Sequence, residues 1–347
     1  ITPATLSITG TKTYDGNTNF VSNTLAVAGA VNGETITLTT GSGTSASANA
    51  GTYAGSTLTG LAISVTGGNA LASNYALPST GDLTITPATL SITGTKTYDG
   101  NTNFVSNTLA VAGAVNGETI TLTTGSGTSA SANAGTYAGS TLTGLAISVT
   151  GGNALASNYA LPSTGDLTIT PATLSITGTK TYDGTAVFNA GALSVTGLVA
   201  SDAIDTATAV SQNVASNGSN YFTTFTLSTG SAANYQLASA GVNNSAQITP
   251  ATLSITGTKT YDGNTNFVSN TLAVAGAVNG ETITLTTGSG TSASANAGTY
   301  AGSTLTGLAI SVTGGNALAS NYALPSTGDL TITPATLSIT GTKTYDG

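Results

Sequence analysis

Residues 1–16 read ITPATLSITGTKTYDG, and this stretch decides the fold because the chain repeats it. The same letters begin again at Ile85, Ile169, Ile248 and Ile332. The spacings are 85 − 1 = 84, 169 − 85 = 84, 248 − 169 = 79 and 332 − 248 = 84 residues. Most solenoid repeats run about 20–45 residues. A period near 80 residues therefore predicts one small domain per repeat.

The period divides the chain into four whole repeats and part of a fifth. The units that begin at Ile1, Ile85 and Ile248 are identical over their full length. The unit that begins at Ile169 shares only the opening and then diverges. The predicted domains are repeat 1 (1–86), repeat 2 (87–170), the divergent repeat 3 (171–249), repeat 4 (250–333) and the first strand of a truncated fifth repeat (334–347). Because the sequence stops inside a unit, we expect it to be a window onto a longer array.

Within a repeat the apolar residues alternate with Thr, Ser or Ala. TLSIT around Leu6 and Ile8, ETITLTT around Ile36 and Leu38, and DLTIT around Leu83 all show this period of two. Such alternation is typical of half-buried β-strands, and Thr suits the exposed face of a pleated sheet. Each repeat is therefore predicted to be all-β, with Gly10 interrupting the first strand.

Six or seven short strands in about 84 residues predict a small antiparallel β-sandwich, Ig-like or β-grasp-like. A β-grasp-like sheet or another incomplete barrel is the alternative. Repeat 3 supports a shared packing scheme, since it keeps apolar residues at Phe188, Leu193 and Val195 while its exposed residues change. Its missing five residues are expected to shorten a loop or a hairpin in the middle of the unit.

The join between repeats has no flexible linker. Leu83 and Ile85 occupy odd positions, whereas Leu90 and Ile92 occupy even ones, so the apolar phase flips across Pro87. A one-residue slip turns the apolar set of a strand to its other face. The first pair is therefore predicted to face the preceding core and the second the following core. A direct strand-to-strand join predicts domains connected end to end as a stiff rod.

The composition excludes several classes of function. The chain has a formal net charge of −8, with five Lys and Arg together, and no His, Cys, Met or Trp. A basic nucleic-acid surface, an ordinary zinc site and a His- or Cys-based catalytic site are therefore excluded. No apolar run reaches the ~20 residues of a membrane-spanning helix. We expect no enzyme, no cofactor, no nucleic-acid partner and no membrane insertion.

Four short motifs recur in a fixed order: Lys12-Thr13-Tyr14-Asp15-Gly16, Gly51-Thr52-Tyr53, Asn74-Tyr75-Ala76-Leu77 and Thr84-Ile85-Thr86. In this the chain resembles the YDG domain of large bacterial extracellular proteins, over essentially its whole length. Repeat 3 departs at the second motif, where Ser219-Asn220-Tyr221 stands instead. The resemblance implies filamentous-haemagglutinin-type surface adhesins, a stalk role and an extracellular or bacterial cell-surface location. It implies no catalytic residues.

One candidate reaction site comes from the residues themselves. If the first strand is continuous, Lys12 lies on the face of Leu6 and Ile8. An inward Lys near Asn74, with Asp15 or Glu34 to move protons, would form an intramolecular Lys–Asn isopeptide crosslink. The alternative is a surface Lys12 paired with Asp15, with the Asp15-Gly16 turn packing Tyr14 against its own repeat.

Metal binding has less support. The acidic residues are scattered, and no Asp-x-Asp-x-Asp-Gly calcium loop is present. Asp202 and Asp205 in repeat 3 are the close acidic pair. No metal site is predicted.

The sequence therefore predicts a structural stalk or filament segment acting as a stiff spacer, with copies of itself in a fibre as candidate partners. The alternative is a multivalent module in which each repeat binds host or matrix glycan or mucin weakly.

Overall fold

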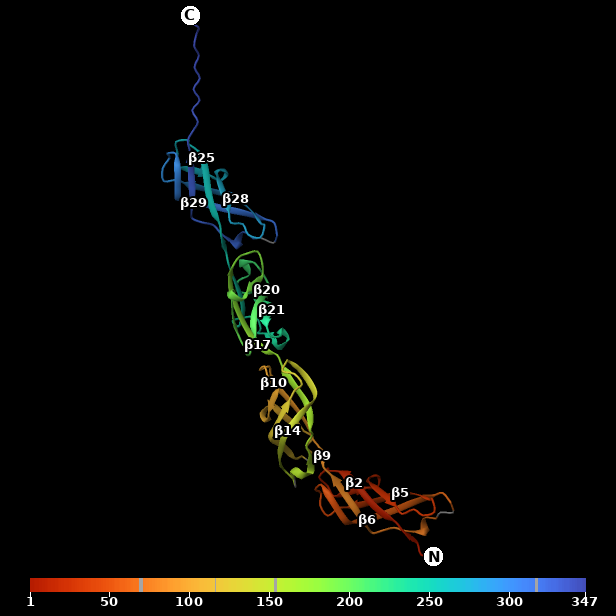
Figure 1. The fold of residues 1–347 in the computed structure, drawn as a ribbon. Helices are drawn as coiled ribbons and strands as arrows, with labels where there is room; N and C mark the ends of the chain where they lie inside the picture. The colour runs from red at the N-terminus through yellow and green to blue at the C-terminus, as the bar shows by residue number, and fades with distance from the viewer. Residues whose placement is uncertain (69–70, 116, 153–154, 316–317) are drawn as a thin grey trace. The chain divides into compact units, whose positions relative to one another are not determined.

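The structure is a computed structural model that describes residues 1–68, 71–115, 117–152, 155–315 and 318–347. The chain forms two compact units, Ile1–Pro171 with repeats 1 and 2 and Ala172–Gly347 with repeats 3 and 4. Each unit is built of all-β tandem repeats (Figure 1). The helical elements of the described residues are 3₁₀ turns of three residues, and none of them is long enough to cross a membrane.

Repeat 1 shows the basic pattern. Its elements are β1 (Ala4–Thr5), β2 (Ser7–Thr13), β3 (Asn19–Val21), η1 (Ser22–Thr24), β4 (Leu25–Ala28), β5 (Thr35–Thr44), β6 (Gly51–Thr66), η2 (Ala72–Asn74), β7 (Tyr75–Ala76) and β8 (Thr80–Thr86). Six strands form one sheet in the order β3-β5-β6-β8-β2-β4, and β1 pairs separately with β7.

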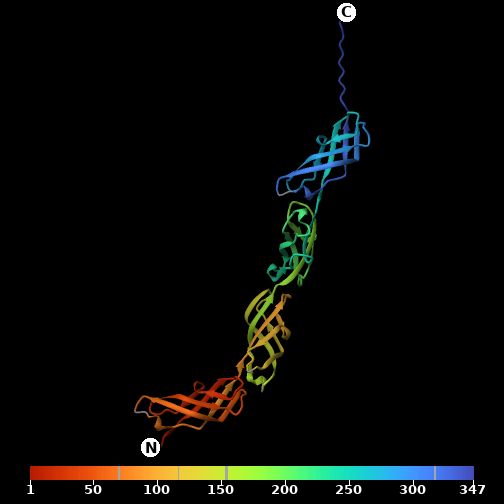
Figure 2. The same cartoon turned by 180° about the vertical axis from the view of Figure 1, so that it is seen from behind.

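That sheet is strongly curled into a half-barrel (Figures 1 and 2). Strands β3 and β4 form its two opposite edges although only η1 separates them in the chain, so the sheet must bend to bring its edges together. A single curled sheet thus replaces the predicted two-sheet sandwich and corresponds to the incomplete-barrel alternative.

The sheet is mixed, not purely antiparallel. The first long strand, β2, pairs in parallel with the last one, β8, with Thr9 opposite Asp82 and Thr13 opposite Thr86. Every other pairing within this sheet is antiparallel. The two terminal strands of a repeat are therefore neighbours near the middle of its sheet.

Repeats 2 and 4 have the same order of strands. In repeat 2 they are β9 (Ala88–Thr89), β10 (Ser91–Thr97), β11 (Asn103–Val105), η3 (Ser106–Thr108), β12 (Leu109–Ala112), β13 (Thr119–Thr128), β14 (Gly135–Thr150), η4 (Ala156–Asn158), β15 (Tyr159–Ala160) and β16 (Thr164–Thr170). In repeat 4 they are β24 (Ala251–Thr252), β25 (Ser254–Thr260), β26 (Asn266–Val268), η8 (Ser269–Thr271), β27 (Leu272–Ala275), β28 (Thr282–Thr291), β29 (Gly298–Thr313), η9 (Ala319–Asn321), β30 (Tyr322–Ala323) and β31 (Thr327–Thr333).

Repeat 3 divides its strands between two sheets. Its elements are β17 (Ala172–Thr181), β18 (Val187–Asn189), η5 (Ala190–Ala192), β19 (Leu193–Thr196), β20 (Ala203–Ala209), η6 (Val214–Ser216), β21 (Phe222–Thr229), η7 (Ala232–Asn234), β22 (Tyr235–Leu237) and β23 (Asn244–Thr249). Strands β19, β17, β22 and β23 form one sheet, and β18, β20 and β21 form the other. The central hairpin β20–β21 is shorter than β5–β6, which confirms the expected site of the deletion.

Strand β2 continues through Gly10, so the predicted interruption of the first strand is wrong. The packing around Gly10 explains why a glycine stands there. A Cβ atom there would lie 2.6 Å from Leu83 Cδ2 and 2.8 Å from Leu25 Cδ2. The missing side chain thus gives room to the core, where Leu83 and Phe20 are completely buried. The strand remains continuous because its hydrogen bonds come from the backbone of β4 and β8.

The apolar phase flip at Pro87 is also found. Leu83 and Ile85 lie in β8 of repeat 1, and Ile92 lies in β10 of repeat 2, and all three are at most 2% exposed. Residues 334–347 form no strand and are exposed. In whole repeats the equivalent strand pairs with residues 82 − 9 = 73 positions further along, which this sequence does not contain.

Candidate functional site: the contact between successive repeats

The contact between repeats 1 and 2 is built around one buried carboxylate. Tyr14, directly after β2, donates its hydroxyl to Glu118 Oε1, and Tyr159 donates its hydroxyl to Glu118 Oε2 at 2.7 Å. The two tyrosine rings meet edge to face, with centroids 5.6 Å apart. All three residues are at most 6% exposed. A side chain of repeat 1 therefore completes a buried polar group of repeat 2.

A buried amide strengthens the same contact. Asn158 is completely buried, its Oδ1 accepts a bond from the Ala50 backbone N–H at 2.8 Å, and its Nδ2 donates to Asn49 Oδ1 at 3.0 Å. Buried polar groups cost free energy unless they are hydrogen-bonded. Separating the repeats would expose both partners, so Glu118, Asn158 and Tyr159, here named the receiving cluster of repeat 2, fix where repeat 1 sits.

Repeats 3 and 4 form the same contact with a different donor sequence. Tyr182 and Tyr322 donate to the two oxygens of Glu281, and their ring centroids lie 5.5 Å apart. Asn321 accepts a bond from Val214 N–H at 2.9 Å and donates to Asn213 at 2.8 Å. The contact thus survives the divergence of repeat 3, which indicates that it depends on a few side chains and not on the whole sequence.

The receiving cluster is assembled within its own repeat. In repeat 1 Tyr75 donates to Glu34 Oε2 at 2.6 Å and accepts a bond from Val31 N–H at 3.1 Å. In repeat 3 Tyr235 makes the same two bonds with Asp202 and Val199. Asn74 of repeat 1 is exposed, whereas its counterpart Asn158 is buried. A preceding repeat therefore enters a site that is already formed.

The enclosure changes the acidity of the phenols. Burial, followed by the hydrogen bond to Glu118, raises the pKa of Tyr14 to about 12. Burial and the same carboxylate raise the pKa of Tyr159, against the Val115 N–H, which lowers it. Both hydroxyls remain protonated at neutral pH and act as donors. The site is closed to solvent, and its hydrogen bonds hold the two repeats together.

Apolar packing is continuous across this contact. One cluster of buried side chains includes Leu83 and Tyr14 from repeat 1 and Ala88, Leu90 and Tyr159 from repeat 2. The core of repeat 1 therefore continues into repeat 2 at this contact. Tyr14 itself belongs to this cluster, so its ring packs with the core of its own repeat, as predicted, and also meets Tyr159 of the next repeat.

Beside Tyr14, each repeat carries a lysine anchor. The Lys12 ammonium donates to Asp15 Oδ1 at 2.7 Å, to Asn17 O at 2.7 Å and to Asn17 Oδ1 at 2.8 Å, and it lies 5.2 Å from the Phe20 ring centroid. Its side chain is 7% exposed. The predicted inward direction of Lys12 is thus found, together with its pairing to Asp15.

The lysine also shifts the acidity of its partner. Burial would raise the pKa of Asp15, but the Lys12 hydrogen bond and the Asn17 N–H outweigh it, so that this pKa lies below its ordinary value. The anchor recurs at Lys96, Lys180 and Lys259. It closes the loop between β2 and β3 in each repeat.

The structure does not bring the four isopeptide candidates together. Lys12 lies with Asp15 beside the last residues of β8, whereas Asn74 precedes Tyr75, which pairs with Ala4. Eight residues of extended chain from Ala4 to Lys12 span about 26 Å at about 3.3 Å each. Glu34, bonded to Tyr75, lies at the Asn74 end. The proposed crosslink within one repeat is therefore wrong, because the residues divide between its two ends.

The acidic pair of repeat 3 is also divided. Asp202 accepts the hydrogen bond of Tyr235, whereas Asp205 lies 3.3 Å from Thr226 Oγ1. Among the described residues no three His, Cys, Asp or Glu side chains gather as metal ligands do.

Sequence reasoning missed the receiving cluster, although two signals for it were present. Glu34 is replaced in repeat 3 by another acid, Asp202, which is the conservative change that a hydrogen-bond acceptor requires. The spacing Ser-x-Asn also recurs, at Ser47 and Asn49 and at Ser211 and Asn213. In both cases the Ser hydroxyl accepts the N–H of the Asn, which holds the loop that meets the next repeat.

Comparisons with known proteins agree with the repeat pattern. A search of curated proteins found no match. Among solved structures, the Bacillus anthracis TIE protein aligns at 9% identity over 95% of this chain and 67% of its own, with a TM-score of 0.18, too low to carry an argument. The YDG domain family matches four successive segments: 1–82, 81–166, 165–242 and 244–330. These segments cover nearly the whole chain, which therefore belongs to the YDG domain family as four tandem domains.

Proposed function

We propose that this chain is a tension-bearing stalk segment of a secreted bacterial surface protein, and not an enzyme. The observation that carries the proposal is the parallel pairing of β2 with β8 in each repeat of this type. The chain enters a repeat through the first of these strands and leaves it through the second. A pull on the two ends therefore acts on that pair.

The direction of the pull decides how the bonds are loaded. Force enters at the start of β2, near Ser7, and leaves at the end of β8, near Thr86, so that the two parallel strands are drawn past each other. In this shear geometry the backbone bonds between residues 9–13 and 82–86 share the load. In a peeling geometry they would break one at a time, each worth about 0.5–1.5 kcal/mol.

The contact between repeats fits the same role. β8 passes through Pro87 directly into β9, and the receiving cluster fixes the following repeat through buried hydrogen bonds. A spacer of this kind gains length by adding repeats, which suits units of identical sequence. Under this proposal the repeats continue end to end as a stiff rod.

Location and context are further parts of the proposal. The composition, rich in Thr and Ser and poor in charged residues, is the support for extending the proposal to an extracellular stalk of the filamentous-haemagglutinin type on a bacterial cell surface. Antibodies against this chain should label intact cells of the organism that makes it. Labelling only after lysis would contradict the location.

Single-molecule force spectroscopy tests the mechanical role. Pulled from its two ends, the chain should show separate unfolding events, each releasing at most about 300 Å for 84 residues at about 3.6 Å per residue. The matched comparison is a chain pulled between Thr2→Cys and Ser79→Cys, which grips β2 and β8 of repeat 1 from the same end. The chain has no native Cys, so the attachment is unique.

Repeat 1 should unfold at a clearly lower force in the second geometry, because its bonds then break in succession. Equal forces in the two geometries would show that the β2–β8 pair does not bear the load, and the proposed role would fall.

A further inference from the structure

Repeat 3 differs from the other repeats at one place in its sheet. In repeat 1, β6 pairs with β8 from Gly51 to Thr57. In repeat 3 the corresponding strands, β21 and β23, lie in separate sheets. The contact to the next repeat and the lysine anchor are nevertheless retained. The opening in the sheet is therefore a local change in a repeat that keeps its structural role.

Two buried asparagines hold the edges of this opening, and Asn244 bridges the two strands that no longer pair. Asn244 accepts a bond from Phe222 N–H at 2.8 Å and donates to Phe222 O at 3.0 Å and to Ala238 O at 2.9 Å. Asn220 donates to Ser211 O at 2.9 Å and accepts the Ser211 N–H at 3.0 Å. Both are at most 4% exposed. The opening is therefore braced by side chains.

The bracing turns a tyrosine outward. Ala246 lies opposite Gly178, as Leu83 lies opposite Gly10, so Ala246 occupies the place of Leu83. Its N–H donates to Asn220 O, whereas Leu83 pairs with Tyr53. Asn220 thus takes the place of Tyr53, and the sequence match of Tyr221 to Tyr53 is wrong by one residue. Because a one-residue shift changes the face, Tyr221 is 36% exposed.

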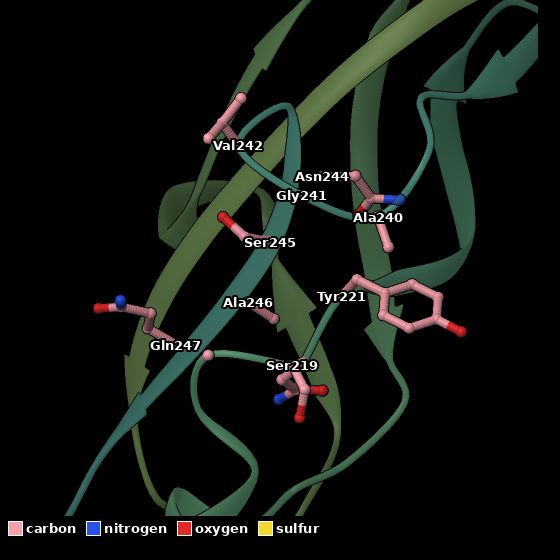
Figure 3. A pocket seen from close by; sticks show the side chains of 11 residues that line it. Ser219, Tyr221, Ala240, Gly241, Val242, Asn244, Ser245, Ala246 and Gln247 are labelled. Carbon is pink, nitrogen blue, oxygen red and sulfur yellow. The ribbon is translucent and has the colours of Figure 1, made fainter.

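A cavity of about 550 Å³ lies at this opening (Figure 3). It is lined by residues 218–221, 240–242 and 244–247. Figure 3 shows Ser245 and Gln247 on the opposite side of β23 from Ala246. A second hollow, of about 480 Å³, shares Ser245 and Gln247 and continues over Thr177 and Thr179 of β17. Both volumes lie within the range of small-molecule sites, about 300–1,000 Å³.

We propose that repeat 3 binds a neutral glycan in this cavity. No charged side chain lines either hollow, so an ionic ligand would find no counter-charge. The lining offers an exposed phenol ring at Tyr221 and a hydroxyl at Ser219 on one side of β23, and an amide at Gln247 and a hydroxyl at Ser245 on the other (Figure 3). The C–H face of a sugar ring packs against an aromatic ring, and its hydroxyls exchange hydrogen bonds with amides and hydroxyls. The site belongs to repeat 3, in contrast to weak binding by every repeat.

Ligand-observed saturation-transfer NMR on the full chain tests this site. The probes are neutral trisaccharides of glucose, mannose and N-acetylglucosamine, with a uronic-acid oligosaccharide as the charged comparison. At least one neutral probe should receive saturation. Tyr221→Ala and Gln247→Ala should each weaken its binding by about tenfold, whereas Tyr261→Ala, at a tyrosine 47% exposed in repeat 4, should leave binding unchanged.

Three results would overturn the proposal: no binding of any neutral probe at millimolar concentration, equal binding of the uronic-acid probe, or binding that survives both repeat 3 variants. Thermal unfolding of each variant confirms that it is folded, and Gln247→Ala decides the matter if Tyr221→Ala does not fold. Force spectroscopy does not depend on glycan binding. A negative binding result would therefore refute the glycan site without refuting the proposed stalk role.

Discussion

Tyr14 donates a hydrogen bond to Glu118, which lies 104 residues further along the chain and in the next repeat. Glu118 receives a second bond from Tyr159 of its own repeat. The carboxylate therefore has one donor that is always present and one that arrives only with the preceding repeat. This hydroxyl therefore adds to the coupling between the two repeats that the Asn158 bonds and the apolar packing also provide.

Replacing that hydroxyl should loosen the contact. In Tyr14→Phe the ring remains but Glu118 loses one of its two phenol donors, which we expect to cost about 1–3 kcal/mol. Hydrogen exchange at the Val115 and Glu118 amides should become faster, by about tenfold for each 1.4 kcal/mol lost. The matched control is Tyr261→Phe, at the same position in repeat 4, where the tyrosine is 47% exposed. Equal effects of the two changes would contradict the coupling.

Asn74 and Asn158 allow a sharper comparison, because they lie in identical local sequences but Asn74 is exposed and Asn158 is buried. Asn158→Ala should destabilise the contact by about 1–3 kcal/mol, since Ala50 N–H and Asn49 each lose a buried partner. Asn74→Ala, in the same local sequence but exposed, should change stability by less than about 0.5 kcal/mol. Exchange at the Ala50 amide reports the first change directly. If the two variants behave alike, the Asn158 bonds do not hold the repeats together.

High pH should separate the repeats before it unfolds them. The Tyr14 pKa is raised to about 12 from an ordinary value of 10.0, so the stabilisation is complete below pH 10 and is lost as pH rises through about 12. Ionisation of Tyr14 also places a second negative charge beside Glu118. The difference in near-ultraviolet tyrosinate absorbance between the native chain and Tyr14→Phe isolates this titration. A midpoint near 10 would show that Tyr14 is not enclosed.

The sequence predicted the parts of the fold that depend on apolar alternation. It placed most strands of the whole repeats and the flip at Pro87, because these follow from which residues are apolar, and the shorter spacing of repeat 3 located its deletion. It could not show that β2 and β8 pair in parallel, since alternation fixes the face of a strand but not its neighbours. For the same reason it predicted a two-sheet sandwich where the structure has one curled sheet.

The contact between repeats was beyond the same reasoning for a related reason. Tyr14 and Glu118 are polar partners far apart in the chain, and the local sequence around either residue does not identify the other as its hydrogen-bond partner. The isopeptide hypothesis failed similarly. Alternation placed Lys12 on the inner face of its strand, as found, but did not show that Asn74 lies at the other end of the repeat.

The lysine anchor gives the last prediction. Lys12→Met keeps the apolar stem over Phe20 but leaves Asp15 and the Asn17 carbonyl without their cation. Hydrogen bonds to charged groups contribute about 1.5–3 kcal/mol when buried. Because Asp15 is 48% exposed, we expect a smaller loss, of about 1–2 kcal/mol.

Hydrogen exchange in the loop between β2 and β3 measures this loss. Asp15, whose pKa is lowered by the lysine, should weaken the loop in the same way when acid protonates it, because this stability is lost as pH falls through the lowered pKa. Lys343→Met, at a lysine 82% exposed beside an exposed Asp346, is the control and should have no measurable effect. Intact mass should equal the sequence mass, and a loss of ammonia would instead show that Lys12 or its counterparts are crosslinked.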